Sequence, residues 1–199
     1  MKRLMKLTTQ NAKSIYTEAN NMNILKPNVA VFSSLIFLVF SVVDTAAGGD
    51  YADGKLGKAL ILDGESHSVK IPHYAGLKPI RAITISAWIK PERVTKGKDS
   101  WQQIYRKQER RSHGFMAIGE YRNKHSLCFG LKIHGFPHHV EHGVPLEPAK
   151  LLDGKWHLVC VTYDGKAMTF YADGQELGVK AAAGQLDTQG EAPAYIGSR

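Results

Sequence analysis

Four histidines and one glutamate lie within nine residues in the segment HGFPHHVEH, and side chains of these types bind metal ions. Imidazole is a common ligand of zinc and copper. In an extended chain, His138 and His142 would face one side while His139 and Glu141 would face the other, so at most two or three groups could converge on one ion. The segment, which begins at His134, therefore favours a solvated loop at the rim of the fold over a metal site.

Several aromatic side chains near predicted loops could stack on the apolar faces of sugar rings. Trp101, Tyr105 and Phe136 are of this kind, although packing in the core is an equal alternative for Trp101. Trp88 and Trp156 lie in apolar runs, where large aromatic side chains usually pack into the core. The candidate ligand-binding residues at the rim are Trp101, Tyr105, Phe136, His138, His139 and His142.

The carboxylates do not follow the pattern of a glycoside hydrolase. Such enzymes use one carboxyl as nucleophile or base and a second as acid, about 5–10 Å apart. On one strand face these would recur at every second residue, and the only such pair is Asp63 and Glu65, which straddles a turn at Asp63-Gly64. The sequence also lacks a Gly-x-Ser-x-Gly elbow, a phosphate-binding loop and a His-Glu-x-x-His helix. We therefore predict that the protein is not an enzyme.

Composition and periodicity indicate short strands joined by turns. The 199 residues include 19 glycines and 8 prolines spread between apolar runs, and no helical repeat persists over several turns. The sequence therefore predicts an all-β fold. Its expected elements are a hairpin over 58–72, a strand over 83–90 that Pro91 ends, an edge-type strand over 102–108, and strands over 114–121 and 126–133.

The clearest pattern lies between Trp156 and Leu177. The runs WHLVCVTY, AMTFYA and QELGV are separated by Asp164-Gly165 and Asp173-Gly174. Glycine in such a turn can adopt the positive φ that a tight hairpin needs. This arrangement predicts a meander of three antiparallel strands.

The first 47 residues are typical of an export signal. Residues 29–43 form an uncharged run of 15, followed by small residues. A membrane-spanning helix needs roughly 20 apolar residues, whereas the apolar part of a signal peptide needs about 7 to 15. We predict a signal helix over residues 1–47 with cleavage between Ala47 and Gly48, and a translation start at Met22 would give it a normal length.

Export would leave a domain over residues 48–199 that is secreted or lies in the cell envelope or periplasm. An uncleaved signal, the alternative, would be its only link to a membrane. An oxidising compartment allows a disulfide between Cys128 and Cys160, although two buried free thiols are an equal alternative.

The charge distribution does not indicate a nucleic acid partner. The formal net charge is +8, but residues 1–47 contribute +3 of it. In the remainder, basic and acidic residues alternate, except in the segment RKQERR at residues 106–111. For this segment we favour a solvated loop over a patch that binds polyanions.

Four segments occur in the order GKLGKALILDGESHSVKIP, AITISAWIKP, DGKWHLVCVTYDGKAMTFYADGQELG and APAYIGSR. Together they resemble the laminin G-like branch of the concanavalin A-like lectin/glucanase superfamily, over about residues 50–199. The resemblance implies a concanavalin A-like jelly-roll sandwich of two antiparallel sheets, one of them curved, with loops at the rim that carry ligands. In this family a further strand normally follows, so the chain resembles a domain whose last strand is missing.

The resemblance also bears on cofactors. Calcium is the frequent cation of the family and needs several convergent oxygen ligands. Asp99, Asp153 and Asp187 could contribute, but they do not match the family's residues one by one. We therefore predict no cofactor and leave calcium open.

The function that the resemblance implies is non-catalytic binding outside the cytoplasm, with a carbohydrate or an extracellular protein surface as the ligand. The alternative is a targeting or accessory domain of a larger exported enzyme or adhesin. A glycoside hydrolase is less well supported, because the paired carboxylates are missing.

Overall fold

Apolar residues alternate along the longest strands, and this alternation builds a sheet with one buried face. In β5 (Ile83–Lys90), Ala87 is buried while its neighbours are more exposed. In β10 (His157–Tyr163), Val159 and Val161 are fully buried. Because strand side chains alternate between the two faces of a sheet, these residues direct a single face toward the core.

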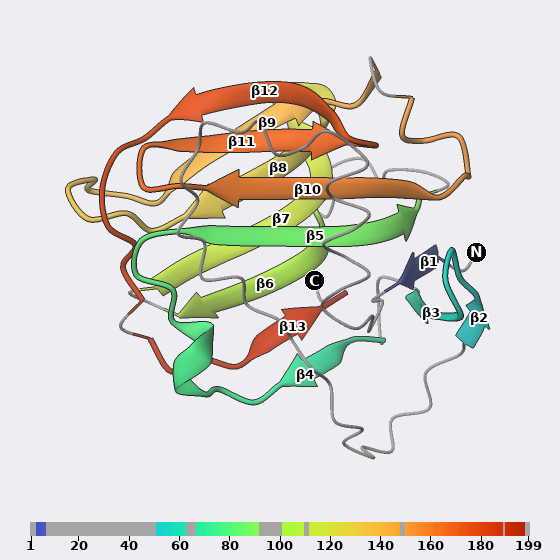
Figure 1. Cartoon of the computed structure of the whole chain (residues 1–199), viewed down its shortest axis with the longest axis horizontal. Helices are drawn as coiled ribbons and strands as arrows, with labels where there is room; N and C mark the ends of the chain where they lie inside the picture. Colours follow the sequence, from blue (N-terminus) through green and yellow to red (C-terminus); the bar gives the residue numbers. More distant parts are fainter. Residues whose placement is uncertain are drawn as a thin grey trace.

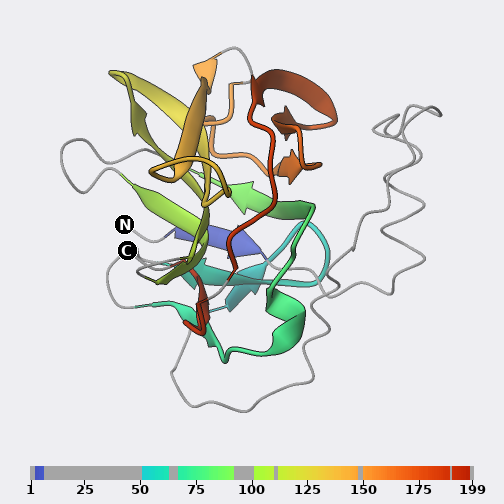
Figure 2. The same ribbon diagram turned by 90° about the vertical axis from the view of Figure 1, so that its left-hand side faces the viewer.

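The computed structural model describes residues 3–6, 51–62, 67–91, 101–109, 112–147, 150–188 and 190–197; for residues 3–6, 109, 112 and 113 it describes the backbone only. Two antiparallel sheets pack face to face, as Figure 1 and Figure 2 show from two directions. The predicted all-β sandwich is therefore confirmed. No helix among the described residues is long and apolar enough to cross a membrane.

The larger sheet has seven strands and the smaller sheet has six. In spatial order, the larger sheet comprises β12 (Gln175–Ala181), β11 (Ala167–Ala172), β10, β5, β1 (Arg3–Lys6), β3 (Lys58–Leu62) and β2 (Tyr51–Asp53). The smaller sheet comprises β4 (Val69–Ile71), β13 (Ala194–Ile196), β6 (Gln102–Glu109), β7 (Ser112–Tyr121), β8 (Lys124–Leu131) and β9 (Val140–Pro145). A short 3-10 helix, η1 (Ala75–Leu77), lies between β4 and β5.

Most strands fall where their local pattern predicts them. The meander is confirmed, because β11 pairs with both β10 and β12 across the two Asp-Gly turns. The strand over 83–90 is confirmed as β5. The predicted strands over 114–121 and 126–133 correspond to β7 and β8, which pair as a hairpin.

Two predicted pairings are wrong. Residues 58–72 do not form a hairpin, because β3 pairs with β1 and β2 in the larger sheet while β4 pairs with β13 in the smaller one. The strand over 102–108 is not at an edge, because β6 lies between β13 and β7. In both cases a partner distant in sequence determines the pairing. The Asp63-Gly64 turn and Glu65 lie outside the described residues.

The strand β1 falls inside the segment for which we predict a signal helix. Its backbone pairs antiparallel with β3 on one side and with β5 on the other. The rest of residues 1–50, including the Ala47–Gly48 bond, lies outside the described residues. The signal peptide and its cleavage therefore stay predictions.

The main core fills the space between the sheets. Phe129 of β8 and Phe170 of β11 are both fully buried and meet edge to face, with ring centroids 6.3 Å apart and an interplanar angle of 82°. Since β8 and β11 belong to different sheets, this pair joins the two layers of the sandwich.

A second, smaller cluster lies on the opposite face of the six-stranded sheet. It consists of Phe115, Ala117 and Cys128, with the half-buried Trp101 and Tyr121 packed against them. The Trp101 ring meets the Phe115 ring edge to face, with centroids 5.7 Å apart. Trp101 therefore packs in an aromatic cluster on the sheet rather than in a rim loop.

Both cysteines carry free thiols. Cys128 belongs to the outer cluster of the smaller sheet, whereas Cys160 lies in β10 of the larger sheet, between the core-facing Val159 and Val161. The two side chains thus point away from each other on different layers. The structure favours two free thiols over the disulfide that the sequence also allowed.

The prediction that Trp88 and Trp156 pack in the core is wrong. Both are only partly buried. Trp88 alternates with the core-facing Ala87 and Ile89, so its ring lies on the outer face of β5, where the Lys55 ammonium is 5.4 Å from the ring centroid.

Candidate functional site at one end of the sandwich

Four connections meet at one end of the sandwich, at the left in Figure 1, and we call this region the loop end. The connections are residues 72–82 between β4 and β5, 132–139 between β8 and β9, 164–166 between β10 and β11, and 182–193 between β12 and β13. The last of these is hydrogen-bonded to each of the other three. The bonds run from Leu186 N–H to Ile80 O (2.9 Å), from His134 N–H to Gln185 O (2.8 Å) and from Gly184 N–H to Gly165 O (3.0 Å).

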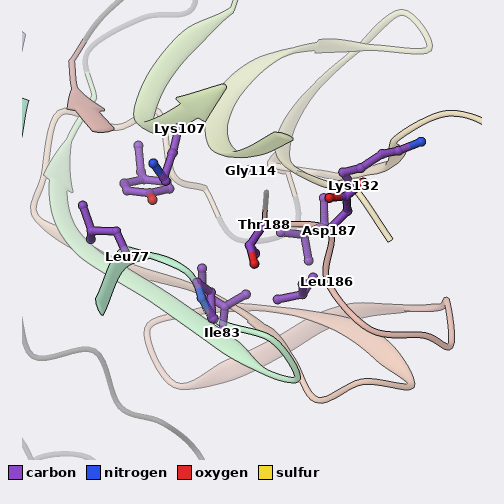
Figure 3. A pocket seen from close by; sticks show the side chains of 11 residues that line it. Leu77, Ile83, Lys107, Gly114, Lys132, Leu186, Asp187 and Thr188 are labelled. Carbon is purple, nitrogen blue, oxygen red and sulfur yellow. The ribbon is translucent and has the colours of Figure 1, made fainter. Parts of the chain in front are cut away.

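An open pocket lies within the loop end (Figure 3). Its cavity volume is about 40 Å³, so it is a small hollow in the surface. The wall is mainly apolar, and polar groups lie at a few places around it. The apolar and aromatic residues are Leu77, Pro79, Ile83, Tyr105, Leu131 and Leu186, and the polar ones are Lys107, Lys132, Asp187 and Thr188.

Two hydroxyl groups in the pocket are available to a ligand. Among the residues that the structure describes, neither the Tyr105 hydroxyl nor the Thr188 hydroxyl has a hydrogen-bond partner. Burial, with a smaller electrostatic effect of Tyr74, raises the pKa of Tyr105 to about 12. The Tyr105 phenol therefore keeps its proton at physiological pH and can donate a hydrogen bond.

Lys107 contributes a buried ammonium group to the same wall. Lys107 is only 7% exposed. Its Nζ donates one hydrogen bond to the Ala192 carbonyl oxygen and a second, 3.2 Å long, to Nδ1 of His73. Because an ammonium group has no acceptor, Nδ1 of His73 must accept this bond. These contacts hold Lys107 at the boundary between β6 and the connection over 182–193.

Large apolar side chains are exposed in the connections that form the loop end. Tyr74 is 47% exposed, Ile80 60% and Phe136 38%, and these are three of the five exposed large apolar residues among those described. Tyr74 precedes η1 beside Leu77, whereas Phe136 follows Lys132, and Figure 3 shows Leu77 and Lys132 on opposite sides of the pocket. Exposed aromatic rings beside an apolar hollow are typical of a ligand-binding surface.

Local contacts hold the two segments that carry Phe136 and Tyr74, whose exposed rings we call the aromatic platforms. The Lys132 ammonium donates to the carbonyl oxygens of Phe136 (3.1 Å) and Pro137 (3.2 Å), which closes the loop over 132–139. The Tyr74 ring lies over Gly76, where a Cβ atom would be 2.4 Å from Cε2 of that ring. A glycine at this position therefore allows the ring to lie against the backbone.

The structure brings together some of the predicted rim residues and separates others. Tyr105 lines the pocket from β6, and Phe136, His138 and His139 lie in the neighbouring connection over 132–139. His142 lies elsewhere, in β9, where its ring is 5.7 Å from the Phe170 ring and 6.0 Å from the Tyr121 ring. Local sequence gave no signal for Tyr74 or Thr188, because only the pairing of distant segments brings them to one place. Lys107 belongs to the basic segment over 106–111, and the prediction of a solvated loop there is wrong for its first part, because residues 106–109 lie in β6 and Lys107 is buried.

The structure also places the candidate metal ligands. His139 Nε2 is 3.2 Å from Glu141 Oε2, and the described residues contain no group of three or more His, Cys, Asp or Glu that could hold a metal ion. Asp153 binds His157 and Lys155 at the opposite end of the sandwich, while Asp187 lines the pocket. Asp99 lies outside the described residues, and calcium binding stays untested.

The sequence over residues 63–199 matches the laminin G-like model described as the concanavalin A-like lectin/glucanases superfamily. The chain belongs to this superfamily. The family resemblance of the four segments and the two-sheet fold are therefore confirmed. No curated protein is detectably similar to this sequence.

Solved structures of this superfamily fold resemble the chain. The binding domain of Paraclostridial Mosquitocidal Protein 1 superposes with a TM-score of 0.60 at 16% identity, over 75% of this chain and 37% of that one. Domain 4 of AbnA, a GH43 extracellular arabinanase from Geobacillus stearothermophilus solved in complex with arabinotriose, superposes with a TM-score of 0.53 at 21% identity, over 77% of this chain and 68% of that one. At these identities the likeness shows the fold alone.

Proposed function

We propose that this protein is a non-catalytic carbohydrate-binding module that acts outside the cytoplasm, and that the loop end is its binding site. The observation that carries this proposal is an apolar pocket with two hydroxyl groups that have no hydrogen-bond partner among the described residues, together with the exposed aromatic side chains of Tyr74 and Phe136 in two connections of the same loop end.

The chemistry of a sugar suits this arrangement. A pyranose or furanose ring has an apolar C–H face and a rim of hydroxyl groups. The apolar wall and the rings of Tyr74 and Phe136 can pack against C–H faces. The hydroxyls of Tyr105 and Thr188 can exchange hydrogen bonds with the rim of a sugar, which fixes its orientation.

Binding without cleavage fits the carboxylates of the pocket. Hydrolysis of a glycosidic bond uses a pair of carboxyl groups on the two sides of the bond. Among the described lining residues, Asp187 is the one carboxylate.

The rival function is a targeting or accessory domain that packs on a neighbouring protein through the same exposed apolar side chains. This function predicts binding of protein rather than polysaccharide.

Affinity gel electrophoresis with soluble polysaccharides tests the proposal. The fold shared with an arabinanase domain solved with arabinotriose makes arabinan a reasonable first member of a panel that also contains xylan, β-glucan and polygalacturonate. We expect at least one polysaccharide to retard the protein and remain uncut. If none of a broad panel retards it, the rival function is favoured, and release of reducing sugar would overturn the non-catalytic assignment.

Removal of either platform should weaken binding. We expect Tyr74→Ala and Phe136→Ala each to lower affinity by about fivefold, because an aromatic contact contributes about 1 kcal/mol. Titration calorimetry with the polysaccharide that retards the protein most strongly provides the measurement. Tyr51→Ala is the matched control, since Tyr51 is a 69% exposed tyrosine in β2, away from the loop end. An equal loss in the control would contradict the assignment of the site.

A subtler change tests the position of the Tyr74 ring. Gly76→Ala places a methyl group where the ring now lies, so the ring must move while the phenol itself is kept. We expect affinity to fall toward that of Tyr74→Ala, with the free energy of unfolding changed by no more than about 0.5 kcal/mol, as for most surface substitutions. Unchanged affinity would show that the resting place of the ring is irrelevant to binding.

A further inference from the structure

We propose that the exported domain binds an extended segment of another protein as an added β-strand, between β5 and β3 of the larger sheet. This inference concerns a surface other than the carbohydrate site and rests only on the export that the proposed function includes. It follows from the short strand β1, which fills part of this place, and from the backbone edge of β5 that β1 leaves open.

The strand β5 is paired along one edge and only partly along the other. On one edge, β10 pairs with residues 83–89. On the other edge, β1 pairs with Trp88, Ile89 and Lys90, beside the arrowhead of β5 in Figure 1. No residue that the structure describes pairs with residues 83–87 on that edge. A strand inside the sheet therefore keeps an open backbone edge, the feature to which a further strand can pair.

The burial of β5 changes along the strand in the same way. Ala87 and Ile89 face the core and are buried. Ile85 faces the core as well and packs against it, but it is only half-buried. On the outer face, Thr84 and Ser86 are exposed. An added strand would cover Ile85, so it would gain apolar contacts as well as hydrogen bonds.

The place of β1 is one strand wide, and other contacts keep it so. Among the described strands, β1 alone joins β3 and β2 to the rest of the larger sheet. However, Leu62 of β3 is buried in the core, and its side chain occupies the position where a Cβ atom on Gly197 would lie. Gly197 directly follows β13 of the smaller sheet, so packing across the sandwich holds β3. Without β1, a gap of two strand spacings, about 9–10 Å, would separate β3 from β5.

Export of the domain would empty this place. Cleavage between Ala47 and Gly48 would remove residues 3–6 with the signal, and translation from Met22 would omit them. An uncleaved signal would keep them on the cytoplasmic side of the membrane, because the segment that precedes a signal anchor does not cross it. In each of these predicted cases the exported domain lacks β1, and the whole length of β5 is open to another strand.

The neighbours of the gap specify the strand that fits it. Because β1 is antiparallel to both β3 and β5, we expect the same direction for the added strand. Its residues opposite Ile85 and Ile89 face the core and must be apolar. Its residues opposite Thr84 and Ser86 face outward, where β-branched polar residues pack well. Lys90 favours an acidic residue opposite it. The partner segment is therefore as long as the eight residues of β5, apolar at alternate positions and free of proline.

A labelled peptide tests the gap in the full chain. The peptide EVTITVTV has the required alternation, whereas the control EVVVITTT has the same composition in blocks, and both carry terminal lysines for solubility. Met5→Pro removes the backbone N–H of the residue that pairs with both Leu60 and Ile89, so it weakens the competing strand β1. By fluorescence anisotropy, we expect the alternating peptide to bind Met5→Pro about tenfold more tightly than the wild type.

The block peptide should bind both proteins at least about tenfold more weakly than the alternating peptide binds Met5→Pro, since its apolar residues cannot all face the core. Equal binding of the two peptides would overturn the inference. If polysaccharide still retards a protein that binds neither peptide, this inference fails and the proposed function stands. Circular dichroism checks that Met5→Pro is folded.

Disulfide crosslinking locates the peptide without any change to β1. Thr84→Cys places a thiol on β5 beside its open edge, and the seventh residue of the alternating peptide, which lies opposite, is made cysteine. Opposite residues of an antiparallel pair are about 4.5–5.5 Å apart, within reach of a disulfide. Val179→Cys is the matched control, because Val179 is 51% exposed on β12, an edge strand of the same sheet. We expect crosslinking to Thr84→Cys to be about tenfold faster, and equal rates would contradict a specific place beside β5.

Discussion

Replacement of Phe170 by alanine is expected to lower the free energy of unfolding by about 3–5 kcal/mol, the usual loss for a fully buried phenylalanine. The residue has no exposed surface, and its ring contacts Phe129 of the other sheet and His142 of β9. Truncation would leave a cavity between the layers and remove the edge-to-face pair that joins them. For a chain of this length the melting temperature should fall by roughly 10 °C.

Urea denaturation followed by tryptophan fluorescence measures this loss. Phe136→Ala removes the same side chain from an exposed position and should change the free energy of unfolding by no more than about 0.5 kcal/mol. If Phe170→Ala cost less than about 1 kcal/mol, the two sheets could not depend on this ring for their packing.

The second large effect concerns His157, which links two turns at the end opposite the pocket. Its Nδ1 is 2.7 Å from Asp173 Oδ2 and its Nε2 is 2.9 Å from Asp153 Oδ1. Asp173 also accepts the Leu158 N–H (2.9 Å), and Asp153 accepts the Lys155 N–H (2.9 Å). Both ring nitrogens can donate at once only in the protonated imidazolium.

The pKa values determine the sign of the pH dependence. Burial alone would lower the pKa of His157, but the hydrogen bonds to Asp173 and Asp153 and their charges outweigh it, so the pKa is raised above 6.5. The bond to His157, with help from Lys155, lowers the pKa of Asp153 to about 2 from 3.8. The stability from protonated His157 is therefore complete below pH 6.5 and lost as pH rises through the folded-state pKa. The contribution of Asp153 is present above pH 3.8 and lost as pH falls toward 2.

We expect His157→Gln to lower the free energy of unfolding by about 2 kcal/mol at pH 5.5, since hydrogen bonds to charged groups contribute about 1.5–3 kcal/mol. Above the folded-state pKa of His157 the difference from the wild type should shrink. Denaturation curves between pH 4 and pH 9 provide the measurement, with the exposed His138→Gln as the control. A difference that stays constant across this range would show that His157 acts by packing alone.

Local patterns predicted those parts of the fold that local interactions determine. The meander was predictable because Asp164-Gly165 and Asp173-Gly174 fix the two bends, and the alternation in β5 identifies its buried face. The pairing of β4 with β13 was not predictable, because the two strands lie more than one hundred residues apart in the chain. The same limit applies to Trp88, whose apolar run is buried on one face while the tryptophan lies on the other.

The candidate site shows the same division. Phe136 and Tyr105 were candidates because both are aromatic residues near predicted loops, and the structure places both at the loop end. Tyr74 and Thr188 were missed because neither lies in a motif, and only the fold places them beside Tyr105. His142 was assigned to the same solvated loop as the other histidines of its segment, whereas β9 begins at Val140 and carries it into the sheet.

The pocket has walls from both layers, since Ile83 belongs to β5 of the larger sheet and Tyr105 to β6 of the smaller one. A bound saccharide would therefore contact both sheets at once and stabilise their packing against each other. By thermodynamic linkage, a ligand at one hundred times its dissociation constant adds about 2.7 kcal/mol to the stability of the native state. Unfolding of the protein thus becomes a label-free readout of occupancy, and heating it in the presence of unfractionated polysaccharides would reveal the one that it recognises.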